Sequence, residues 1–419
     1  MLLVGTTAVA CSGSGPATGP TTGPATAPAT GSAPAPAPAG LDPAAQRYLD
    51  AVVAEDADAP AAAFAEDAVV IDVGREIRGR HDPAGPLPAR RPRRIPRPPP
   101  PRHRRRPDHQ GRSAVRPTRS PTRRDTVARQ ETVTFDNGDG TTLTGDLFLP
   151  DHPAPAVVVA GTWTSVKELM ADRYARKLAE RGYAALSFDF TGFGASGGAP
   201  RDVENPERKV RDIRAALTFL AGRPEVDGDR LAALGICAAA MYMSDATAQD
   251  PRIRALALVA PWLHDAEVCA EAYGGDGAVA ERIKAGLEAR ARYDETGEVD
   301  YVPVVSVTDE RAAMPYDIDF YLNPERGAVP AWPNRFAVMA WADWLTYDAI
   351  ELAPRISRPV LLVHSEDAAI PQGARRFHAA LAGRKDILWT EGTQFDFYDR
   401  APQVELALDT VTAHFDRSL

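Results

Sequence analysis

Residues 129–419 alternate short, continuous apolar runs with longer segments of helical periodicity. Runs such as 156–160 and 254–259 are typical of strands that are buried on both faces. Segments such as 207–220 and 404–414 gather their apolar residues on one side of a helix. Because strands that alternate with helices form mostly parallel sheets, we expect an α/β fold with helices on both faces of the sheet. The functional side chains of such a fold lie at the carboxyl ends of its strands.

The same pattern predicts the order of the elements. Two alternating strands open the region at 131–135 and 142–149, and the turn-forming stretch 136–140 joins them. The further strands that we expect are 156–160, 183–188, 230–236, 254–259, 359–364 and 386–389. The helices that we expect are 167–181, 207–220, 238–248, 373–381 and 404–414.

A single cysteine stands where the apolar run 230–236 meets an alanine-rich helical run. The stretch Gly235-Ile-Cys237-Ala-Ala239 matches the strand–turn–helix pattern of a nucleophile elbow, usually G-x-S-x-G, from which the cysteine and Ala239 depart. Such a turn raises its apex side chain above the sheet and directs the next N–H toward a developing oxyanion. A thiolate attacks carbonyl carbon well, and we expect the helix N-terminus to lower the pKa of the Cys237 thiol. The alternative is that Cys237 is only a small buried apolar residue.

Four further segments stand in a fixed order around this turn: 161–168, 189–198, 363–371 and 391–399. With the elbow, they resemble the landmarks of the α/β-hydrolases, in particular the dienelactone-hydrolase-like and bacterial peptidase-like members, over residues 129–419. The resemblance implies a mostly parallel α/β-hydrolase sheet with helices on both faces and a cap insertion. It also implies a hydrolase that acts on an ester, thioester or related acyl bond of a small molecule.

The resemblance assigns roles to single residues. The cysteine of the elbow would be the nucleophile, and the backbone N–H groups of Ala238 and of Thr162 or Trp163 would form the oxyanion hole. Asp367 matches the catalytic acid. The neighbouring Glu366 is the alternative, because this loop is one residue shorter than is usual in the family. A solvated loop acid is the other interpretation of Asp367.

The position at which the family has its catalytic histidine is occupied by Gln394. An amide cannot take a proton at neutral pH, and general-base catalysis is typically worth about 10² to 10⁴-fold. His264 follows the sixth strand and has Asp265 beside it, so we consider it as a substitute base. We therefore interpret the site as one that keeps its shape with altered chemistry. The competing hypothesis is a binding protein that has kept the pocket and lost turnover.

An insertion at about 262–355 separates the sixth strand from the seventh. In this family such an insertion usually forms a cap that closes over the nucleophile and selects the substrate. Its aromatic residues fit either an apolar acyl ligand or the core of the cap itself. They are Tyr316, Tyr321, Trp332, Trp341 and Trp344. No cluster of His, Cys and Asp has metal-ligand spacing, so we expect no metal and no cofactor. The oligomeric state is not predicted by the sequence.

Residues 1–40 begin with a short apolar stretch and continue as a Gly, Pro, Ala, Ser and Thr linker. The stretch Ala8-Val9-Ala10-Cys11 resembles the lipobox of a bacterial lipoprotein signal. We therefore expect a lipid anchor at Cys11 and a location in the bacterial cell envelope. Without acylation of Cys11, we expect a cytoplasmic protein. The alternative interpretation is a disordered Pro/Ala-rich N-terminus with no signal.

Residues 41–82 show helical spacing followed by a strand at 68–73. They resemble the beginning of a SnoaL-like domain of the NTF2 superfamily, an α+β fold with a pocket. A complete domain of this kind needs more than twice this length, so we expect a truncated fragment.

Residues 83–128 are rich in arginine and proline. The stretch from His81 to Gln130 holds fifteen arginines and three acidic residues in a chain whose net charge is −9. We expect a disordered segment, either a basic linker or the product of a gene read out of frame. Nucleic-acid binding is not expected, because no aromatic residues interleave with the arginines and the rest of the chain is acidic.

Overall fold

The computed structural model describes residues 69–72, 75–78 and 129–419. The chain divides into two compact units, residues 1–122 and 123–419. In the first unit, β1 (Val69–Asp72) and β2 (Arg75–Arg78) pair as an antiparallel ribbon. β1 lies within the strand expected at 68–73. The expected lipobox, the linker and the Arg/Pro-rich segment lie outside the described residues, as does most of the SnoaL-like fragment, and these stay predictions.

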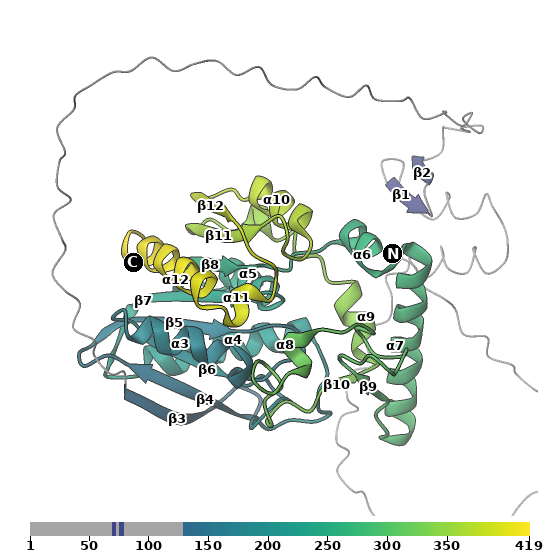
Figure 1. The fold of residues 1–419 in the computed structure, drawn as a ribbon, viewed down its shortest axis with the longest axis horizontal. Helices are drawn as coiled ribbons and strands as arrows, with labels where there is room; N and C mark the ends of the chain where they lie inside the picture. The colour runs from purple at the N-terminus through teal and green to yellow at the C-terminus, as the bar shows by residue number, and fades with distance from the viewer. Residues whose placement is uncertain (1–68, 73–74, 79–128) are drawn as a thin grey trace, which may run out of the picture. The chain divides into compact units, whose positions relative to one another are not determined.

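The second unit is built on an eight-stranded sheet with the order β12-β11-β8-β7-β5-β6-β4-β3 (Figure 1). The pairs β3–β4 and β4–β6 are antiparallel, and all other neighbours in this sheet are parallel. The strands are β3 (Arg129–Asp136), β4 (Thr142–Leu149), β5 (Ala154–Ala160), β6 (Ala184–Phe188), β7 (Val226–Ile236), β8 (Ile253–Val259), β11 (Val360–Ser365) and β12 (Lys385–Thr390). The predicted mostly parallel sheet is confirmed.

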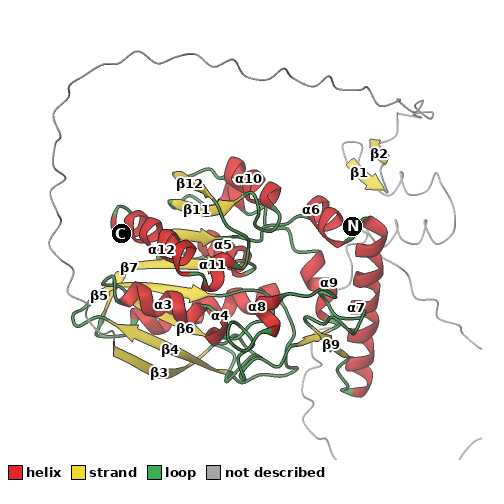
Figure 2. Ribbon diagram, viewed as in Figure 1, coloured by secondary structure: helices red, strands yellow, loops and turns green. Residues whose placement is uncertain are grey.

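Helices cover both faces of this sheet (Figure 2). α3 and α12 pack against each other on one face, and α4 and α5 pack against each other on the other face. The helices around the sheet are α3 (Ala171–Ala179), α4 (Pro206–Ala221), α5 (Ala239–Gln249), α10 (Pro371–Ala380), α11 (Asp396–Asp399) and α12 (Ala401–Asp416). α4 begins where sequence signals place a helix start, because the Asn205 side chain accepts the backbone N–H of Arg208 at 2.8 Å and Pro206 follows.

One expected helix is interrupted. The stretch expected as 167–181 consists of a 3₁₀ turn, η2 (Lys167–Leu169), and then α3. Met170 between them has φ −154° and ψ −28°, which lies outside the helical region. The Lys167 side chain is buried beside Asp189, and its backbone N–H donates to the Asp189 carboxylate at 2.9 Å. These contacts hold η2 in place, so that it does not continue into α3.

The cap lies beyond the carboxyl ends of the parallel strands (Figure 1). It follows β8 and consists of α6 (Ala266–Tyr273), α7 (Asp276–Thr296), β9 (Tyr301–Pro303), α8 (Asp319–Leu322), β10 (Arg335–Ala337), α9 (Ala340–Leu345) and η3 (Ala353–Arg355). β9 and β10 form a separate antiparallel pair. The cap occupies the predicted insertion.

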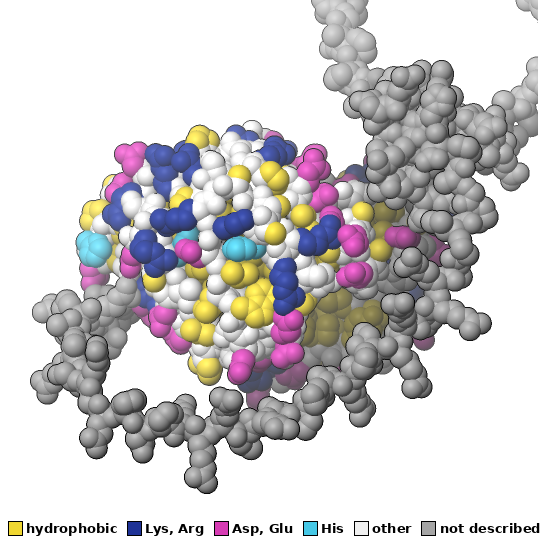
Figure 3. Space-filling view, turned by 90° about the horizontal axis from the view of Figure 1, so that it is seen from above, with side chains coloured by type: hydrophobic (Ala, Val, Ile, Leu, Met, Phe, Trp, Pro, Cys, Tyr) yellow, Lys and Arg dark blue, Asp and Glu magenta, His cyan; other side chains and the backbone are white. Residues whose placement is uncertain are grey.

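The apolar runs of the central strands form the core. β5, β6 and β8 are almost wholly buried between the helical layers, as strands covered on both faces should be. On the face of the second unit that Figure 3 shows, basic and acidic side chains are interspersed. Within the described residues, no helix is both long and apolar enough to cross a membrane.

Candidate active site

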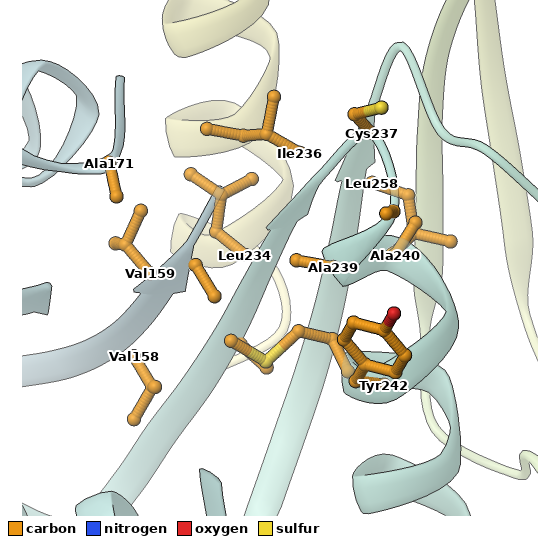
Figure 4. Packing of buried hydrophobic residues seen from close by; sticks show 14 of the residues in the cluster. Val158, Val159, Ala171, Leu234, Ile236, Cys237, Ala239, Ala240, Tyr242 and Leu258 are labelled. Carbon is orange, nitrogen blue, oxygen red and sulfur yellow. The ribbon is translucent and has the colours of Figure 1, made fainter. Parts of the chain in front are cut away.

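Cys237 lies at the apex of the turn between β7 and α5, above the apolar side chains of both elements (Figure 4). Its φ of +55° is in the left-handed region, which costs a residue with a side chain roughly 1–2 kcal/mol. Neighbouring backbone holds it there, because the Cys237 N–H donates to Val259 O at 3.1 Å and the Cys237 carbonyl accepts from Trp262 N–H at 3.0 Å. The expected elbow geometry is present, with its strain supported by the adjacent strand.

Gly235 is required by the close approach of the helix to the strand. A Cβ at this position would lie 2.8 Å from both Ala239 O and Ala240 Cα. The alanine at position 239 replaces the usual closing glycine without a clash, and its N–H donates to Gly161 O at 3.2 Å. That bond ties the start of α5 to the loop that follows β5.

Polar groups of Thr162, Tyr398 and Gln394 and the backbone N–H of Ala238 lie near the Cys237 sulfur. Burial nevertheless raises the pKa of the Cys237 thiol above its usual range, and these polar groups only oppose the rise. The Ala238 N–H at the N-terminus of α5 lowers the pKa of Cys237, as expected, but burial outweighs it and the net shift is upward. The thiol is 6% exposed beneath the cap, and the cost of burying a thiolate there exceeds what the donors return.

The expected oxyanion-hole residues Thr162, Trp163 and Ala238 line one cavity together with Cys237. The loop that carries Thr162 and Trp163 is held at Thr164, which has φ +47°. The Thr164 N–H donates to the buried Glu204 carboxylate at 2.8 Å, and its carbonyl accepts from the Trp332 indole N–H at 2.8 Å. The backbone around the sulfur is thus fixed from both sides.

Gln394 lies at the expected place beside the sulfur and is 6% exposed. Its Nε2 donates to Ala260 O at 2.9 Å and to the Tyr398 hydroxyl at 2.9 Å. Its Oε1 accepts the backbone N–H of Ala369 at 3.0 Å. The side chain is therefore rigidly held, and as an amide it has no basic lone pair to receive the thiol proton.

The two candidate catalytic acids, Asp367 and Glu366, lie in different environments. Asp367 is exposed at the wall of the cavity, together with Ala368 and Ala369. Glu366 points elsewhere, because its carboxylate pairs with Arg375 and accepts the Trp389 indole N–H at 3.0 Å. Between the two candidate acids, the structure places Asp367 at the site and Glu366 in a surface ion pair.

His264 does not serve as a substitute base. Its Nδ1 accepts the Trp262 indole N–H at 2.7 Å, so its Nε2 must carry the proton that is donated to Trp344 O at 3.0 Å. The ring is fully buried, and burial lowers the pKa of His264 to about 4. No lone pair remains to accept a proton from the thiol, and the ring holds the cap to the end of β8.

The cavity over the sulfur has a volume of about 650 Å³. Three of the five cap aromatics that the sequence singled out line it: Tyr316, Tyr321 and Trp344. The other two belong to the cap's own packing, since the ring of Trp332 packs on Tyr321 with centroids 5.2 Å apart and the ring of Trp341 packs on Phe336 with centroids 4.7 Å apart. Some of these aromatic residues therefore line the ligand cavity, and the others form the core of the cap. The wall is mainly apolar, which suits an acyl chain or a ring.

Sequence reasoning assigned no role to Tyr398, although its hydroxyl is part of the site. The residue is 1% exposed and lies four positions after Gln394, on the short helix α11. Side chains four residues apart meet on one face of a helical turn, and that spacing was the available signal. Tyr321 adds a second hydroxyl, which comes from the cap and lies 3.1 Å from Thr162 Oγ1.

In the described part of the chain, the second cysteine and the acidic groups do not form a second centre. Cys269 is a free, fully buried thiol, and burial raises its pKa to about 12. Among residues 129–419 and the two short strands of the first unit, no group of three or more His, Cys, Asp or Glu side chains could hold a metal ion.

Comparison with known proteins links this geometry to hydrolases. Residues 139–298 match the X-Pro dipeptidyl-peptidase (S15) family. The uncharacterized protein PA2218 of Pseudomonas aeruginosa is 31% identical over 303 residues, which span 68% of this chain and 80% of that protein. A thiohydrolase of Eupenicillium brefeldianum is 27% identical over 256 residues, covering 58% of this chain and 79% of the thiohydrolase.

Solved structures agree on the fold. The crystal structure of PA2218 has a TM-score of 0.61 and 28% identity, and the match covers 70% of this chain and 94% of PA2218. The α/β hydrolase GrgF from Penicillium has a TM-score of 0.59 and 24% identity, with 69% of this chain and 99% of GrgF covered. In each case the covered share of this chain is close to the length of its second unit.

Proposed function

Since this chain belongs to the α/β-hydrolase superfamily, we propose that it cleaves an ester, thioester or related acyl bond of a small molecule through Cys237. The sulfur lone pair attacks the acyl carbon, the C–O or C–S bond to the leaving group breaks, and the thiol proton goes to the leaving group. A thioester-linked acyl-enzyme remains on Cys237. Water then attacks this thioester, which releases the carboxylic acid and restores the thiol.

One observation carries the proposal: among the described residues, the only cysteine on the cavity wall occupies the strained apex of the elbow, with the N–H of Ala238 beside its sulfur. This is the arrangement that acyl transfer needs, with a nucleophile and an oxyanion donor on consecutive residues. One relative is named a thiohydrolase, which favours a thioester substrate for this chain.

Gln394 determines which half-reaction is slow. Attack on a thioester by a thiol moves one proton from sulfur to sulfur, whereas hydrolysis must remove a proton from water, which the Gln394 amide cannot accept. Asp367 takes the place of the catalytic acid but has no imidazole to orient. We therefore expect acylation to outrun deacylation.

Gln394 also favours a second candidate function, a binding protein that keeps the hydrolase pocket without turnover. The cavity, its aromatic wall and the buried sulfur would serve either function. The two differ in whether a covalent intermediate forms.

The test is the time course of p-nitrophenol release from p-nitrophenyl acetate by the full chain. We expect a burst of up to one equivalent followed by slow turnover, and we expect Cys237→Ala to abolish both phases. Cys269→Ala is the matched control, because that thiol is also buried and lies outside the cavity wall. A wild-type protein that releases p-nitrophenol no faster than Cys237→Ala would exclude acyl transfer and leave the binding protein.

A further inference from the structure

Arg282 is a cation on the cavity wall that has no acidic partner. It lies on α7 of the cap, next to α6, and is only partly exposed (Figure 1). Among the described residues, no carboxylate pairs with its guanidinium. The two acids on the same wall do not reach it, since Glu271 accepts the Gln372 amide at 2.8 Å and Asp367 belongs to the loop after β11.

Two backbone carbonyls fix one end of the guanidinium. Nη1 donates to Tyr273 O at 3.1 Å and to Ala278 O at 3.0 Å. The group also lies over two rings, with Cζ 5.5 Å from the ring centroid of Tyr273 and 5.7 Å from that of Trp341. These distances are within the range of cation–π attraction. The side chain is therefore held in place before any ligand arrives, so that binding costs little further ordering.

The other edge of the guanidinium is formed by Nε and Nη2. Neither nitrogen has an acceptor in the part of the chain that the structure describes, and both remain accessible to solvent. This edge presents two parallel N–H groups, which match the two oxygens of a carboxylate. Arg326 of the same cap uses the same edge in this way, since its Nε and Nη2 each donate to one carboxylate oxygen of Asp399 at 2.7 Å. Arg282 thus adds a fixed carboxylate-binding edge to the cavity wall.

We propose that Arg282 is a specificity-determining residue that binds a carboxylate of the substrate, at a position remote from the acyl bond that is cleaved. This inference deepens the proposed function and rests on it, because the substrate is the one whose acyl carbon meets Cys237. The mainly apolar wall suits the carbon chain that joins the carboxylate to the acyl carbon. The carboxylate belongs either to the acyl group or to the leaving group, and the experiment below has an arm for each.

The other charges on the wall favour one orientation of such a substrate. Glu271 and Asp367 repel a carboxylate, so Arg282 is the position on the wall at which a negative group is stabilised. The two rings beside the guanidinium reduce its contact with water, and a charge-assisted hydrogen bond is stronger in such surroundings than in bulk water. The anchored carboxylate therefore directs the acyl carbon into the remainder of the cavity, where Cys237 lies.

The test is the initial rate of Cys237 acylation in the full chain, followed by rapid quenching and intact-mass spectrometry with pairs of thioesters. In one arm, N-acetylcysteamine monothioesters of the dicarboxylic acids from succinate to suberate are compared with their methyl esters, which lack the charge. In the other arm, the acetyl thioester of mercaptopropionate is compared with that of its methyl ester. We expect the carboxylate to speed acylation about tenfold or more in the arm that carries it at the correct end, the usual effect of a hydrogen bond between charged groups.

Arg282→Gln should remove this preference. The neutral thioester is the internal reference, because damage to the cap slows both members of a pair alike and leaves the ratio of their rates unchanged. Arg282→Lys keeps the charge without the two parallel N–H groups, so it should retain only part of the preference. Arg290→Gln is the matched control, since this arginine of the same helix pairs with Asp343 and lies outside the cavity wall, and it should keep the full preference.

Equal rates for both members of every pair with the wild-type chain, or a preference that survives Arg282→Gln, would overturn the proposal. A binding measurement separates this outcome from a failure of the proposed function. The same thioesters are titrated into Cys237→Ala and followed by tryptophan fluorescence, since Trp163, Trp262 and Trp344 line the cavity. We expect the carboxylate forms to bind more tightly, and we expect the added Arg282→Gln substitution to abolish the difference. Absence of acylation with this difference retained would exclude Cys237 as the nucleophile and support Arg282, whereas acylation without any preference would do the reverse.

Discussion

A glutamine at position 394 needs a different hydrogen-bond partner from the one that a histidine would need. A catalytic histidine donates its Nδ1–H to a carboxylate, so the acid loop has to present an acceptor. The Gln394 carbonyl is itself an acceptor, and the loop meets it with the backbone N–H of Ala369 while Asp367 remains at the cavity wall. At the proposed base position, the amide thus leaves Asp367 with no imidazole to orient but keeps the loop 366–371 in contact through Ala369.

Gln394→His should restore part of the missing chemistry. An imidazole at this position lies next to the sulfur and within reach of the acid loop, so it can accept a proton from water during deacylation. We expect steady-state p-nitrophenol release to rise on the order of 10²-fold, with a burst of unchanged amplitude. Gln394→Asn, which remains an amide, is the control. Equal turnover of the histidine and asparagine variants would mean that position 394 is not the vacant base position.

At this scale the sequence was sufficient to predict the positions of residues that follow from chain order, and it failed for residues whose surroundings depend on packing. Cys237, Gln394 and Asp367 lie where the loop order predicts them. His264 was misjudged because its two ring bonds, to Trp262 and Trp344, come from the folded cap. The upward net shift of the Cys237 pKa was not predictable for the same reason, since the burial that raises it is supplied by residues distant in the sequence.

Among the elements, α7 shows how the cap is attached. Of its 21 residues, only Gly286 and Ala289 are buried, so the helix touches the rest of the cap along a narrow line. A Cβ on Gly286 would lie 2.8 Å from Ala342 N and 3.2 Å from Trp341 Cβ, both in α9. Trp341 in turn packs on Trp163 at the edge of the oxyanion loop. The glycine therefore sets the spacing of α7 and α9.

Gly286→Ala should loosen the cap. The added methyl group meets backbone, so we expect a net loss of about 1 kcal/mol after the gain in helix propensity. Hydrogen exchange should accelerate in α7 and α9 while β5, β7 and β8 keep their protection. Gly277→Ala in the same helix is the matched control, because nothing lies within 4 Å of its Cβ position and stability should stay equal or rise. Destabilisation by both substitutions alike would contradict the proposed packing.

Element positions were largely predictable in the sheet region and not in the cap. The apolar runs of β5, β7, β8 and β11 are long enough to be predicted as buried strands from the sequence. The break at Met170 was missed because it arises from the buried contacts of Lys167. The cap's short elements have no comparable periodicity, and only the aromatic content of the insertion was visible in advance.

At the scale of the whole molecule, buried histidines make the free energy of unfolding depend on pH. His264, His364 and His414 are fully buried, and burial lowers the pKa of each to about 4. A histidine held neutral in the fold contributes stability that is present above its unfolded pKa of about 6.5 and is lost as pH falls through its folded pKa. Each one should cost about 3 kcal/mol by pH 4.

Urea unfolding between pH 7 and pH 4 measures this loss. We expect the midpoint to fall steadily, and we expect His414→Leu to flatten the decline, because neither ring nitrogen of His414 forms a hydrogen bond with any other described residue. His152→Gln, at an exposed position, is the control and should follow the wild-type curve. A His414→Leu curve that is parallel to wild type would show that this histidine does not contribute to acid sensitivity.

The central claim is that Cys237 forms a covalent acyl-enzyme, and intact-mass spectrometry of the full chain after brief exposure to an acyl thioester tests it most directly. We predict one added acyl group that maps to Cys237, persists long enough to be isolated because Gln394 cannot activate water, and is absent from Cys237→Ala. Turnover of the thioester that is unaffected by Cys237→Ala, or an adduct on another residue, would contradict the account.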